Sequence, residues 1–399
     1  MERYELAEAA RRAGISPDQL RRLVDLGVIT PDAEERFTTG HVLRAELVES
    51  LVAAGIPLDG LGAAIRGGQV SLDFLDEPVF DRFSALGGDT FAQLSERTGV
   101  PVELLTLIRE AAGSSPPLPE DRVRAGELPY AEFIETQVAA GFDPIAVQRL
   151  LRVHGDSLRR MAETEVAWFR SEVVMPALAA GKRPDEIFGL ELAHRLNVAV
   201  EPAVIELYRL VQTGAWTAVI IEGLEQQLAA AGLHSRLEHP PAMCFLDITG
   251  YTGLTQERGD AAAADLATKL ARLVERISMR HGGRPVKWLG DGVMIYYKDP
   301  GPGVVAALEM VAGVAEAGLP PAHVGLHAGH VIFQEGDYYG QTVNVASRIA
   351  DYARPGEVLV SQEVVDASSG TEVAFREIGP VELKGVAGAM RLHAASGPG

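Results

Sequence analysis

The stretch Met243-Cys-Phe-Leu-Asp-Ile-Thr-Gly-Tyr-Thr252 decides the fold of the second half of this chain. Its apolar residues predict a short buried strand that ends at a carboxylate, Asp247, before a polar turn that contains glycine. A second carboxylate, Asp291, lies in an Asp-Gly pair between two strand-like runs, which is the strongest short-range signal for a β-hairpin. If the strand and the hairpin lie side by side, the two carboxylates converge at one end of a sheet. Paired carboxylates beside backbone oxygens suit Mg²⁺, which keeps positions open for substrate phosphates.

Strand and helix patterns alternate throughout the region that starts at this stretch. The order β-α-β-β-α-β predicts an α+β, ferredoxin-like sheet with helices on one face. The expected elements are a strand at 243–248, a helix at 255–281, a hairpin of 284–289 with 292–297, a helix at 302–317, strands at 322–328 and 330–334, and a helix at 342–353.

The overall composition is that of an ordinary globular protein. A chain of 399 residues is long enough for two or more domains. Its formal charge of −19 argues against a nucleic-acid-binding surface over the whole molecule. The single cysteine, Cys244, excludes an intrachain disulfide and suits a reducing compartment. We see no signal peptide pattern and expect no apolar run long enough to span a bilayer, so we predict a cytoplasmic protein.

The first half of the chain has helical periodicity almost throughout. Residues 6–24 predict a helix, a glycine turn and a capped second helix, which resembles the helix-turn-helix of MerR-type regulators. Short motifs recur at a nearly constant displacement, so we expect two related helical subdomains, about 1–85 and 90–170. A helix from Pro202 to Leu233 should end this domain, 1–235. Pro240 and Pro241 mark the boundary before a second domain at 241–396.

Two interpretations of the helix-turn-helix remain open. Residues 1–66 hold eight Arg against eleven Asp or Glu, whereas a protein that reads DNA needs a net basic face. Arg11, Arg12, Arg21 and Arg22 could still form a small basic patch. A helix-turn-helix is also a compact packing unit, so we favour a regulatory or dimerising module and expect DNA binding to be unlikely.

Four polar residues of the second half are unusual in combination. Lys287 precedes Asp291 by four positions on the predicted hairpin, and Asp337 lies in a polar turn before a helix. Asn344 and Arg348 are four apart, so they project from one face of that helix. Each residue alone has an ordinary interpretation, as a surface charge or a helix cap.

The whole pattern resembles the catalytic domain of class III nucleotidyl cyclases. The matching pieces are Phe245-Leu-Asp-Ile-Thr-Gly-Tyr-Thr, Lys287-Trp-Leu-Gly-Asp-Gly, Gly336-Asp-Tyr-Tyr-Gly-Gln-Thr-Val-Asn-Val-Ala-Ser-Arg and Leu383-Lys-Gly-Val. They occur in the order and at the spacing of that family. The combination with a helical front half resembles actinobacterial adenylyl cyclases whose N-terminal domain regulates the catalytic one.

The resemblance implies a role for each motif. Asp247, Asp291 and the backbone of Ile248 would bind two divalent ions, Mg²⁺ or Mn²⁺. Lys287 and Asp337 would recognise adenine, which implies ATP, because guanylyl cyclases of the family place Glu and a small residue there. The remaining implied roles belong to Asn344 for the ribose, Arg348 for the transition state, Lys384 for phosphate, and the backbone of Ile248, Thr249, Gly250 and Tyr251 for the phosphate chain.

The resemblance also implies a head-to-tail homodimer that forms 3′,5′-cyclic AMP and pyrophosphate. One subunit would supply the two aspartates, and its partner would supply Lys287, Asp337, Asn344 and Arg348. The alternative is a DNA-binding regulator that uses the cyclase-like domain as a nucleotide sensor. A pH-responsive front half is a further hypothesis, because four histidines lie in it or in the linker: His154, His194, His234 and His239.

Overall fold

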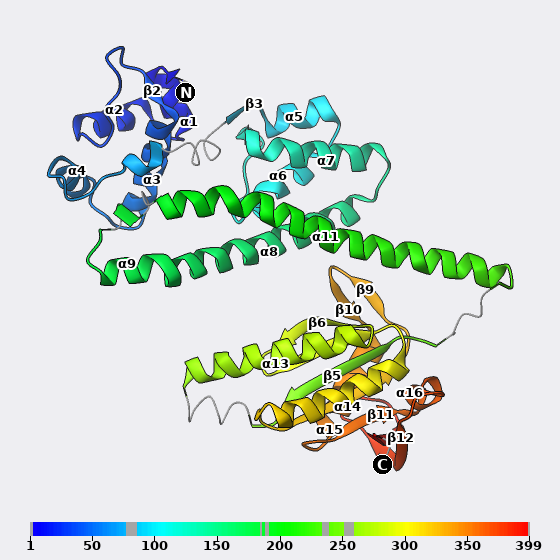
Figure 1. Cartoon of the computed structure of the whole chain (residues 1–399). Helices are drawn as coiled ribbons and strands as arrows, with labels where there is room; N and C mark the ends of the chain where they lie inside the picture. The colour runs from blue at the N-terminus through cyan, green and yellow to red at the C-terminus, as the bar shows by residue number, and fades with distance from the viewer. Residues whose placement is uncertain are drawn as a thin grey trace. The chain divides into compact units, whose positions relative to one another are not determined.

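The computed structural model describes residues 3–76, 86–183, 186–187, 191–233, 239–250 and 259–397. The chain forms two compact units, Met1–Gly223 and Leu224–Gly399. The division falls inside a long helix, upstream of the boundary near residue 240 that the composition predicts. Figure 1 labels most of the helices and several of the strands in both units.

The first unit begins with a helix-turn-helix closed by a two-stranded ribbon. The Ser16 side chain accepts a hydrogen bond from the backbone N–H of Gln19, and Pro17 takes the first helical position, where a missing N–H is harmless. Thr38 caps the third helix in the same way through His41. The elements are β1 (Arg3–Tyr4), α1 (Leu6–Arg12), α2 (Pro17–Asp25), β2 (Phe37–Thr38), α3 (Thr39–Ala53) and α4 (Leu58–Arg66).

The order of strand, two helices, strand and helix occurs a second time within this unit. Thr90 caps its first helix through the backbone N–H of Gln93, as Ser16 does in the first copy. Phe91, Leu105 and Ile134 are buried in a core of its own. The elements of this copy are β3 (Leu86–Thr90), α5 (Phe91–Thr98), α6 (Val102–Ala111), β4 (Arg122–Arg124) and α7 (Leu128–Ala139).

Two long helices follow. The first is α8 (Pro144–Phe169), which continues through a π-helical turn, η4 (Arg170–Val174), into α9 (Met175–Ala179). The second is α11 (Glu191–Ala230), which runs through Pro202 rather than starting at it. By length and composition alone Val198–Ala230 is a candidate membrane span, with a mean hydropathy of 1.2, although five charged residues interrupt it as the sequence predicts.

The second unit is built on a seven-stranded sheet in the order β12-β13-β11-β8-β5-β7-β6. The central strand β5 pairs antiparallel with both β7 and β8. A separate hairpin joins β9 (Ile332–Gln334) to β10 (Asp337–Tyr339). The sheet strands are β5 (Ala242–Ile248), β6 (Gly283–Leu289), β7 (Gly292–Tyr297), β8 (Ala322–Ala328), β11 (Val358–Ser361), β12 (Ala374–Glu382) and β13 (Ala389–Ser396). The helices are α13 (Asp260–Arg280), α14 (Pro300–Glu316), α15 (Gln341–Tyr352) and α16 (Gln362–Ala367).

Helices cover both faces of this sheet. On β5, Cys244 and Leu246 point into a core formed with α13 and α14. Met243 and Phe245 alternate with them and pack with Ala346 of α15 on the opposite face. The α+β fold is confirmed, but the expectation of helices on one face only is wrong. By the same alternation Asp247 lies on the α15 face.

Tyr297 offers a test of this core. Its ring is fully buried, and its hydroxyl makes no hydrogen bond to any described residue. Replacing Tyr297 with phenylalanine removes an unsatisfied polar group, so the free energy of unfolding should stay unchanged or rise by up to about 1 kcal/mol. Tyr297→Ala should instead cost about 3–5 kcal/mol, because the ring space is left empty. Urea unfolding of the two variants measures the contrast, and a clear loss in Tyr297→Phe would contradict it.

Candidate active site

Two carboxylates meet at the end of the central strand. Asp247 is paired with Gly292 of β7 across the sheet, and Asp291 is the residue before Gly292 in the β6–β7 turn. A Cβ on Gly292 would lie 3.0 Å from Asp247 Oδ1, so glycine leaves room for the carboxylate. The pKa of Asp247 is raised, first by burial and then by the negative charge of Asp291, while His323 opposes the shift. This pair therefore concentrates negative charge at the end of β5, beside the β6–β7 turn.

His323 joins this carboxylate pair, although sequence patterns gave no reason to single it out. It lies opposite Asp247 on β8, with its Nε2 3.6 Å from Asp247 Oδ2. Its Nδ1 lies 3.3 Å from the hydroxyl of Thr249. Only the pairing register of β5 with β8 reveals this neighbour, and periodicity alone does not fix that register.

The turn after β5 is only partly available to a phosphate. Ile248 is a buried residue that ends the strand, and the N–H of Thr249 already donates to the carbonyl of Pro321 at 2.9 Å. Gly250 has a φ of 82°, a left-handed conformation that favours glycine. Tyr251 lies outside the described residues. Among the backbone groups expected to face phosphates, the N–H of Thr249 is thus already used in a hydrogen bond within the chain.

Lys287 and Asp337 are brought together from two hairpins. The Lys287 Nζ donates to Asp337 Oδ2 at 2.6 Å, and Asp337 Oδ1 accepts from the N–H of Tyr338. The Tyr338 ring stacks on Tyr296 at 4.6 Å, and its hydroxyl accepts from Arg284. Residues 287 and 294 are partners across β6 and β7, so Lys287 lies on the same sheet face as Asp247. The strand ends at Leu289, so Asp291 lies in the turn rather than on the strand.

Helix α15 presents Asn344 and Arg348 on its exposed face. Thr342, Val345, Ala346, Ile349 and Ala350 form its buried face. The Arg348 Nη1 donates to Asp351 Oδ2 at 2.7 Å. Gly325 of β8 lets the helix approach the sheet, because a Cβ there would lie 2.1 Å from the backbone nitrogen of Ala350.

Lys384 does not join these groups. It is exposed in the turn between β12 and β13, after the buried Leu383. Four strand steps separate β12 from β5, which is about 19 Å across the sheet. Within one chain Lys384 therefore lies far from the carboxylate pair.

A comparison with protein families finds a match for the domain that contains this sheet. Residues 236–396 match the family model of the adenylate and guanylate cyclase catalytic domain. This part of the chain is a nucleotidyl cyclase domain. Residues 4–67 match a second family, the MerR HTH family regulatory protein.

Three relatives are similar over more of the chain than this domain. A pH-sensitive adenylate cyclase of Mycobacterium tuberculosis is 29% identical over 378 residues, which is 89% of this chain and 88% of the relative. An uncharacterized protein of the same species is 30% identical over 59% of this chain and 60% of its own length. An adenylate cyclase of Streptomyces coelicolor is 26% identical over 67% of this chain and 68% of its own length. The crystal structure of the adenylyl cyclase CyaB from P. aeruginosa has 21% identity and a TM-score of 0.35, covering 40% of this chain and 94% of that one.

The carboxylate pair of the cyclase domain fits a divalent cation. Asp247 and Asp291 repel each other, and burial already disfavours the charged form of Asp247. A cation between them would relieve both effects, and carboxylate oxygens are the ligands that Mg²⁺ prefers. Within the described part of the chain no group of three or more His, Cys, Asp or Glu is placed to hold a metal. Further ligands would have to be backbone oxygens, water or substrate phosphates.

The arginines of the helix-turn-helix are engaged within the chain. Arg11 and Arg12 both pair with Glu8, and the pKa of Glu8 is lowered to about 2, chiefly by its hydrogen bond from Arg11. Arg21 pairs with Asp18 at 2.6 Å, and Arg22 pairs with Asp59 at 2.7 Å. Each positive charge of the expected patch thus has an acidic neighbour, which weakens attraction to phosphates.

Proposed function

We propose that this chain converts ATP to 3′,5′-cyclic AMP and pyrophosphate. The ribose 3′-oxygen would form a bond to the α-phosphorus, the bond from that phosphorus to the bridging oxygen of pyrophosphate would break, and the 3′-hydroxyl would lose its proton. The observation that carries the proposal is the ion pair of Lys287 with Asp337 on the sheet face that also bears Asp247. The names of the relatives support cyclase chemistry on adenine nucleotides.

Lys287 and Asp337 would select adenine over guanine. In cyclases that this chain resembles, Lys donates to adenine N1 and Asp accepts from the exocyclic amine. Guanine presents an N–H and a carbonyl at these two positions, so the same pair would meet it with the wrong polarity. Stacking of Tyr338 on Tyr296 and the bond from Arg284 to Tyr338 support the strand that carries Asp337.

The remaining residues would bind and orient the triphosphate. Asp247, Asp291 and the Ile248 carbonyl would hold two Mg²⁺ or Mn²⁺ ions, which when bound favour loss of the 3′-hydroxyl proton and offset charge on the leaving pyrophosphate. Asn344 would hydrogen-bond the ribose and keep the 3′-oxygen in line. Arg348 would exchange its bond to Asp351 for contacts with the phosphoryl oxygens as negative charge develops there.

Lys287→Met tests the choice of nucleotide. It should lower kcat/KM for ATP about 100-fold, because the base would lose a charged donor and Asp337 its partner. Lys287→Glu combined with Asp337→Cys should lower the ratio of ATP to GTP turnover by at least about 10-fold. Lys269→Met is the matched control, since Lys269 is an exposed lysine that pairs with Asp265 of its own helix, α13. Cyclic AMP and cyclic GMP are measured by chromatography, and an unchanged ATP to GTP ratio in the double variant would contradict the assignment.

We also propose that two cyclase domains pack head to tail to complete each site. Exposed apolar residues adjoin the Lys287–Asp337 pair, as expected of a surface that another domain covers. They are Leu289 at the end of β6 and Ile332, Phe333 and Tyr339 of the β9–β10 hairpin. In the dimer Lys287, Asp337, Asn344 and Arg348 of one chain would face Asp247 and Asp291 of the other. Lys384 would then be near a phosphate of the partner's site rather than its own.

The helical domain, about 1–235, would regulate the cyclase domain, about 241–396, in the cytoplasm. Two related subdomains, about 1–85 and 90–170, would receive the signal. This proposal rests on the match of residues 4–67 to a regulatory family and on the doubled order of elements. Turnover of the full chain compared with a fragment starting at residue 224 would test it, and equal rates under all conditions would remove it.

His154 predicts how the first unit responds to acid. It is hydrogen-bonded through Nδ1 to the Tyr130 hydroxyl at 2.7 Å, and burial lowers its pKa while raising that of Tyr130 to about 12. In the unfolded chain His154 takes up a proton near pH 6.5, whereas in the folded chain its lowered pKa disfavours protonation. The contribution of neutral His154 to the free energy of unfolding is therefore complete above pH 6.5 and is lost as the pH falls below it. Urea unfolding followed by far-UV circular dichroism between pH 8 and 5 should show a fall in the free energy of unfolding that His154→Gln reduces. His194 and His234 have no described side chains.

A DNA-binding regulator with a nucleotide-sensing cyclase domain is the second candidate function. The match to the MerR family favours it. The pairing of Arg11, Arg12, Arg21 and Arg22 with acidic neighbours argues against it. A salt-sensitive gel shift with random duplex DNA would support this alternative, and no shift at low salt would exclude it.

A further inference from the structure

The hairpin of β9 and β10 carries Asp337 but does not belong to the main sheet. It forms a two-stranded sheet of its own, in which Phe333 pairs with Tyr338. The two residues of its turn, Glu335 and Gly336, both have a positive φ, which is typical of a tight two-residue connection. An isolated hairpin of two strands is marginally stable in water, so the position of this one depends on contacts with the rest of the domain.

Tyr338 and Arg284 make contacts that fix this hairpin beside the sheet. The Tyr338 ring stacks on the Tyr296 ring of β7, with a centroid distance of 4.6 Å and an interplanar angle of 5°. The Arg284 Nη2 of β6 donates to the Tyr338 hydroxyl at 2.9 Å. The Arg284 guanidinium also lies 5.6 Å from the ring centroid of Phe333 and 5.8 Å from that of Tyr338, which is the range of a cation–π contact. Arg284 thus contacts both strands of the hairpin.

A β-bulge places Arg284 on the same sheet face as Lys287. In a regular strand, two residues that are three positions apart point to opposite faces. The register of β6 with β7 shifts between these two residues, so Arg284 lies opposite Tyr296 and Lys287 lies opposite Met294. Tyr296 and Met294 are two positions apart and share a face, and so do their partners. Strand β6 therefore holds the hairpin at two points, one of which is Asp337.

The ion pair of Lys287 with Asp337 cannot hold the hairpin by itself once a base is bound. Its two side chains are 49% and 20% exposed, and an exposed ion pair contributes little to stability. In the proposed reaction both groups turn to adenine, Lys287 to N1 and Asp337 to the exocyclic amine. The bond from Arg284 to Tyr338 is not used by the base, so it remains to hold β10 in place. Asp337 is tied to the same tyrosine, because its Oδ1 accepts from the N–H of Tyr338 at 2.8 Å.

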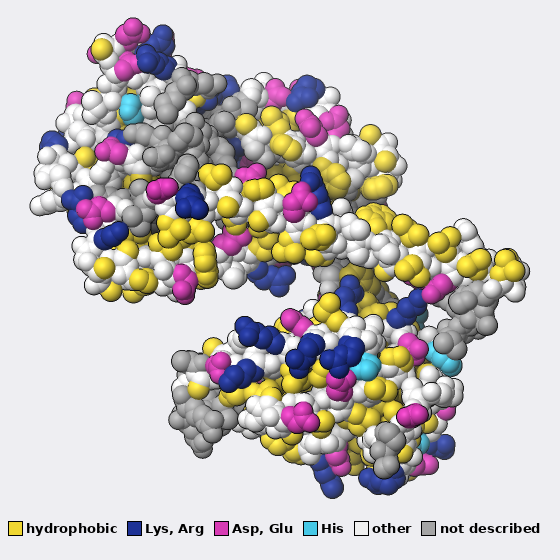
Figure 2. Space-filling view, in the orientation of Figure 1, with side chains coloured by type: hydrophobic (Ala, Val, Ile, Leu, Met, Phe, Trp, Pro, Cys, Tyr) yellow, Lys and Arg dark blue, Asp and Glu magenta, His cyan; other side chains and the backbone are white. Residues whose placement is uncertain are grey.

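Arg284 differs in its surroundings from the basic residues of the neighbouring helix. Figure 2 shows Lys and Arg side chains gathered over α13, and Lys269, Arg272, Arg276 and Arg280 of this helix are exposed. Lys269 and Arg280 pair with acidic residues, as surface charges commonly do. Arg284 is exposed as well, but its planar guanidinium is placed against aromatic rings, which gives it a fixed orientation.

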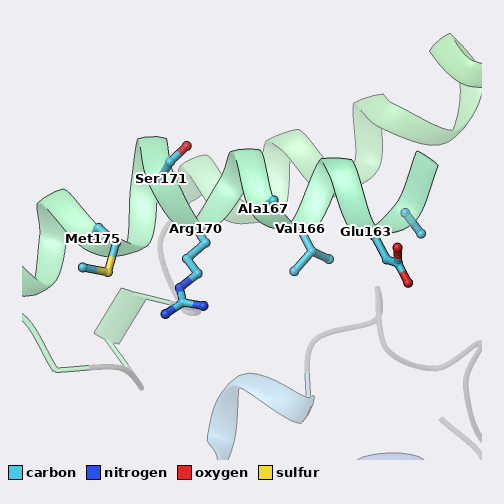
Figure 3. Close-up of a pocket in the computed structure, with 7 residues that line it drawn as sticks. Glu163, Val166, Ala167, Arg170, Ser171 and Met175 are labelled. Atoms are coloured by element: carbon cyan, nitrogen blue, oxygen red, sulfur yellow. The ribbon is translucent and has the colours of Figure 1, made fainter. Parts of the chain in front are cut away.

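The groove of the first unit is a poor alternative site for reading a base. It runs along α8, η4 and α9 with a volume of about 550 Å³ (Figure 3). Its lining is mostly apolar, with Val166, Ala167 and Met175 among its residues. Figure 3 shows Arg170 and Ser171 pointing to opposite sides of the helix. Adenine and guanine are distinguished by convergent hydrogen-bonding groups, which Lys287 and Asp337 supply and an apolar groove does not.

We propose that Arg284 is a positioning residue for the choice of nucleotide, a role that rests on the proposed function. Through Tyr338 it holds Asp337 where a base bound to Lys287 presents its exocyclic amine. Loss of Arg284 leaves the carboxylate pair and the polar residues of α15 in place. It should therefore weaken the recognition of adenine without stopping the transfer step.

Steady-state kinetics of the full chain test this role. Arg284→Met should raise KM for ATP about 10-fold and lower kcat less than about 3-fold, because binding of the base depends on it more than the transfer step does. The ratio of kcat/KM for ATP to that for GTP should fall about 10-fold, since guanine does not form these bonds. Arg272→Met is the matched control, because Arg272 is an exposed arginine of α13, and it should change neither value. An unchanged KM in Arg284→Met, or a fall in kcat alone, would overturn the proposal.

A double-mutant cycle shows whether Arg284 acts through Tyr338. Tyr338→Phe keeps the ring on Tyr296 but removes the oxygen that accepts from Arg284, so KM for ATP should rise about 3-fold. In a chain that already carries Arg284→Met, the same substitution should raise KM no further, because the bond is already lost. Effects of the two substitutions that multiply would also overturn the proposal.

Binding of a non-reacting analogue separates this inference from the proposed function. The Kd of α,β-methylene-ATP with Mn²⁺, measured by isothermal titration calorimetry, should rise about 10-fold in Arg284→Met and stay unchanged in Arg272→Met. The same rise in a chain that makes no cyclic AMP would retain Arg284 as a positioning residue for the base while rejecting the proposed function. Cyclic AMP formation with an unchanged Kd in Arg284→Met would overturn the inference alone. A wild-type chain that neither binds the analogue nor makes cyclic AMP would overturn both.

Discussion

Replacing Asp247 with asparagine should lower kcat for cyclic AMP formation at least about 1,000-fold. The substitution keeps the shape of the side chain but removes half of the negative charge that Asp247 and Asp291 would offer to a cation. It also removes a charge that burial and then repulsion from Asp291 disfavour, as the raised pKa of Asp247 shows, so the protein should be at least as stable as the wild type. Turnover with ATP and Mn²⁺, measured alongside a urea melt, separates lost chemistry from lost folding.

Controls make this result specific to the site. Asp265→Asn should retain full activity, because Asp265 is an exposed residue of α13 that pairs with Lys269 of the same helix. Arg348→Ala should be inactive on its own. Mixing Asp247→Asn chains with Arg348→Ala chains should restore about a quarter of the wild-type specific activity, because half of the dimers are mixed and each holds one intact site. Activity no greater than that of the two parents would contradict a site shared between chains.

Gly325→Ala should destabilise the cyclase domain by at least about 3 kcal/mol. The added Cβ would lie 2.1 Å from the backbone nitrogen of Ala350, which cannot move without shifting α15 off the sheet. Since α15 carries Asn344 and Arg348, activity should fall even at temperatures where the variant remains folded. Urea unfolding of a chain that also carries Trp168→Phe and Trp216→Phe, followed by the fluorescence of Trp288 in β6, measures the change in stability.

A second glycine provides the comparison. A Cβ on Gly126 would meet no atom within 4 Å, and Gly126 does not have a positive φ. Gly126→Ala should therefore leave both the unfolding free energy and turnover within experimental error of the wild type. A small effect of Gly325→Ala, comparable with that of Gly126→Ala, would show that α15 does not depend on this close approach.

Local signals predicted the cyclase domain in detail. The apolar run before Asp247 became β5, and the Asp291-Gly292 pair became the turn of the β6–β7 hairpin. Such elements are specified by neighbours in the sequence, since a turn type and a period of two need no distant contact. The α+β assignment followed from their order.

Long-range features could not be predicted in this way. The approach of His323 to Asp247 depends on the register between β5 and β8, which are far apart in sequence. Helix α15 can pack closely on its side of the sheet because Gly325 has no Cβ. In the local sequence, a glycine at this position predicts only a weakened strand. Pro202 was expected to begin a helix, but α11 passes through it, since tertiary context can override a local preference.

The single cysteine of the chain, Cys244, lies on β5 and points to the sheet face opposite to that of Asp247. Cys244 is fully buried, and burial raises the pKa of its thiol. A thiol held neutral and out of solvent does not react with maleimides or with mild oxidants. A cysteine introduced on the surface would thus be the one reactive thiol for a dye or spin label, and the native Cys244 would not have to be replaced first.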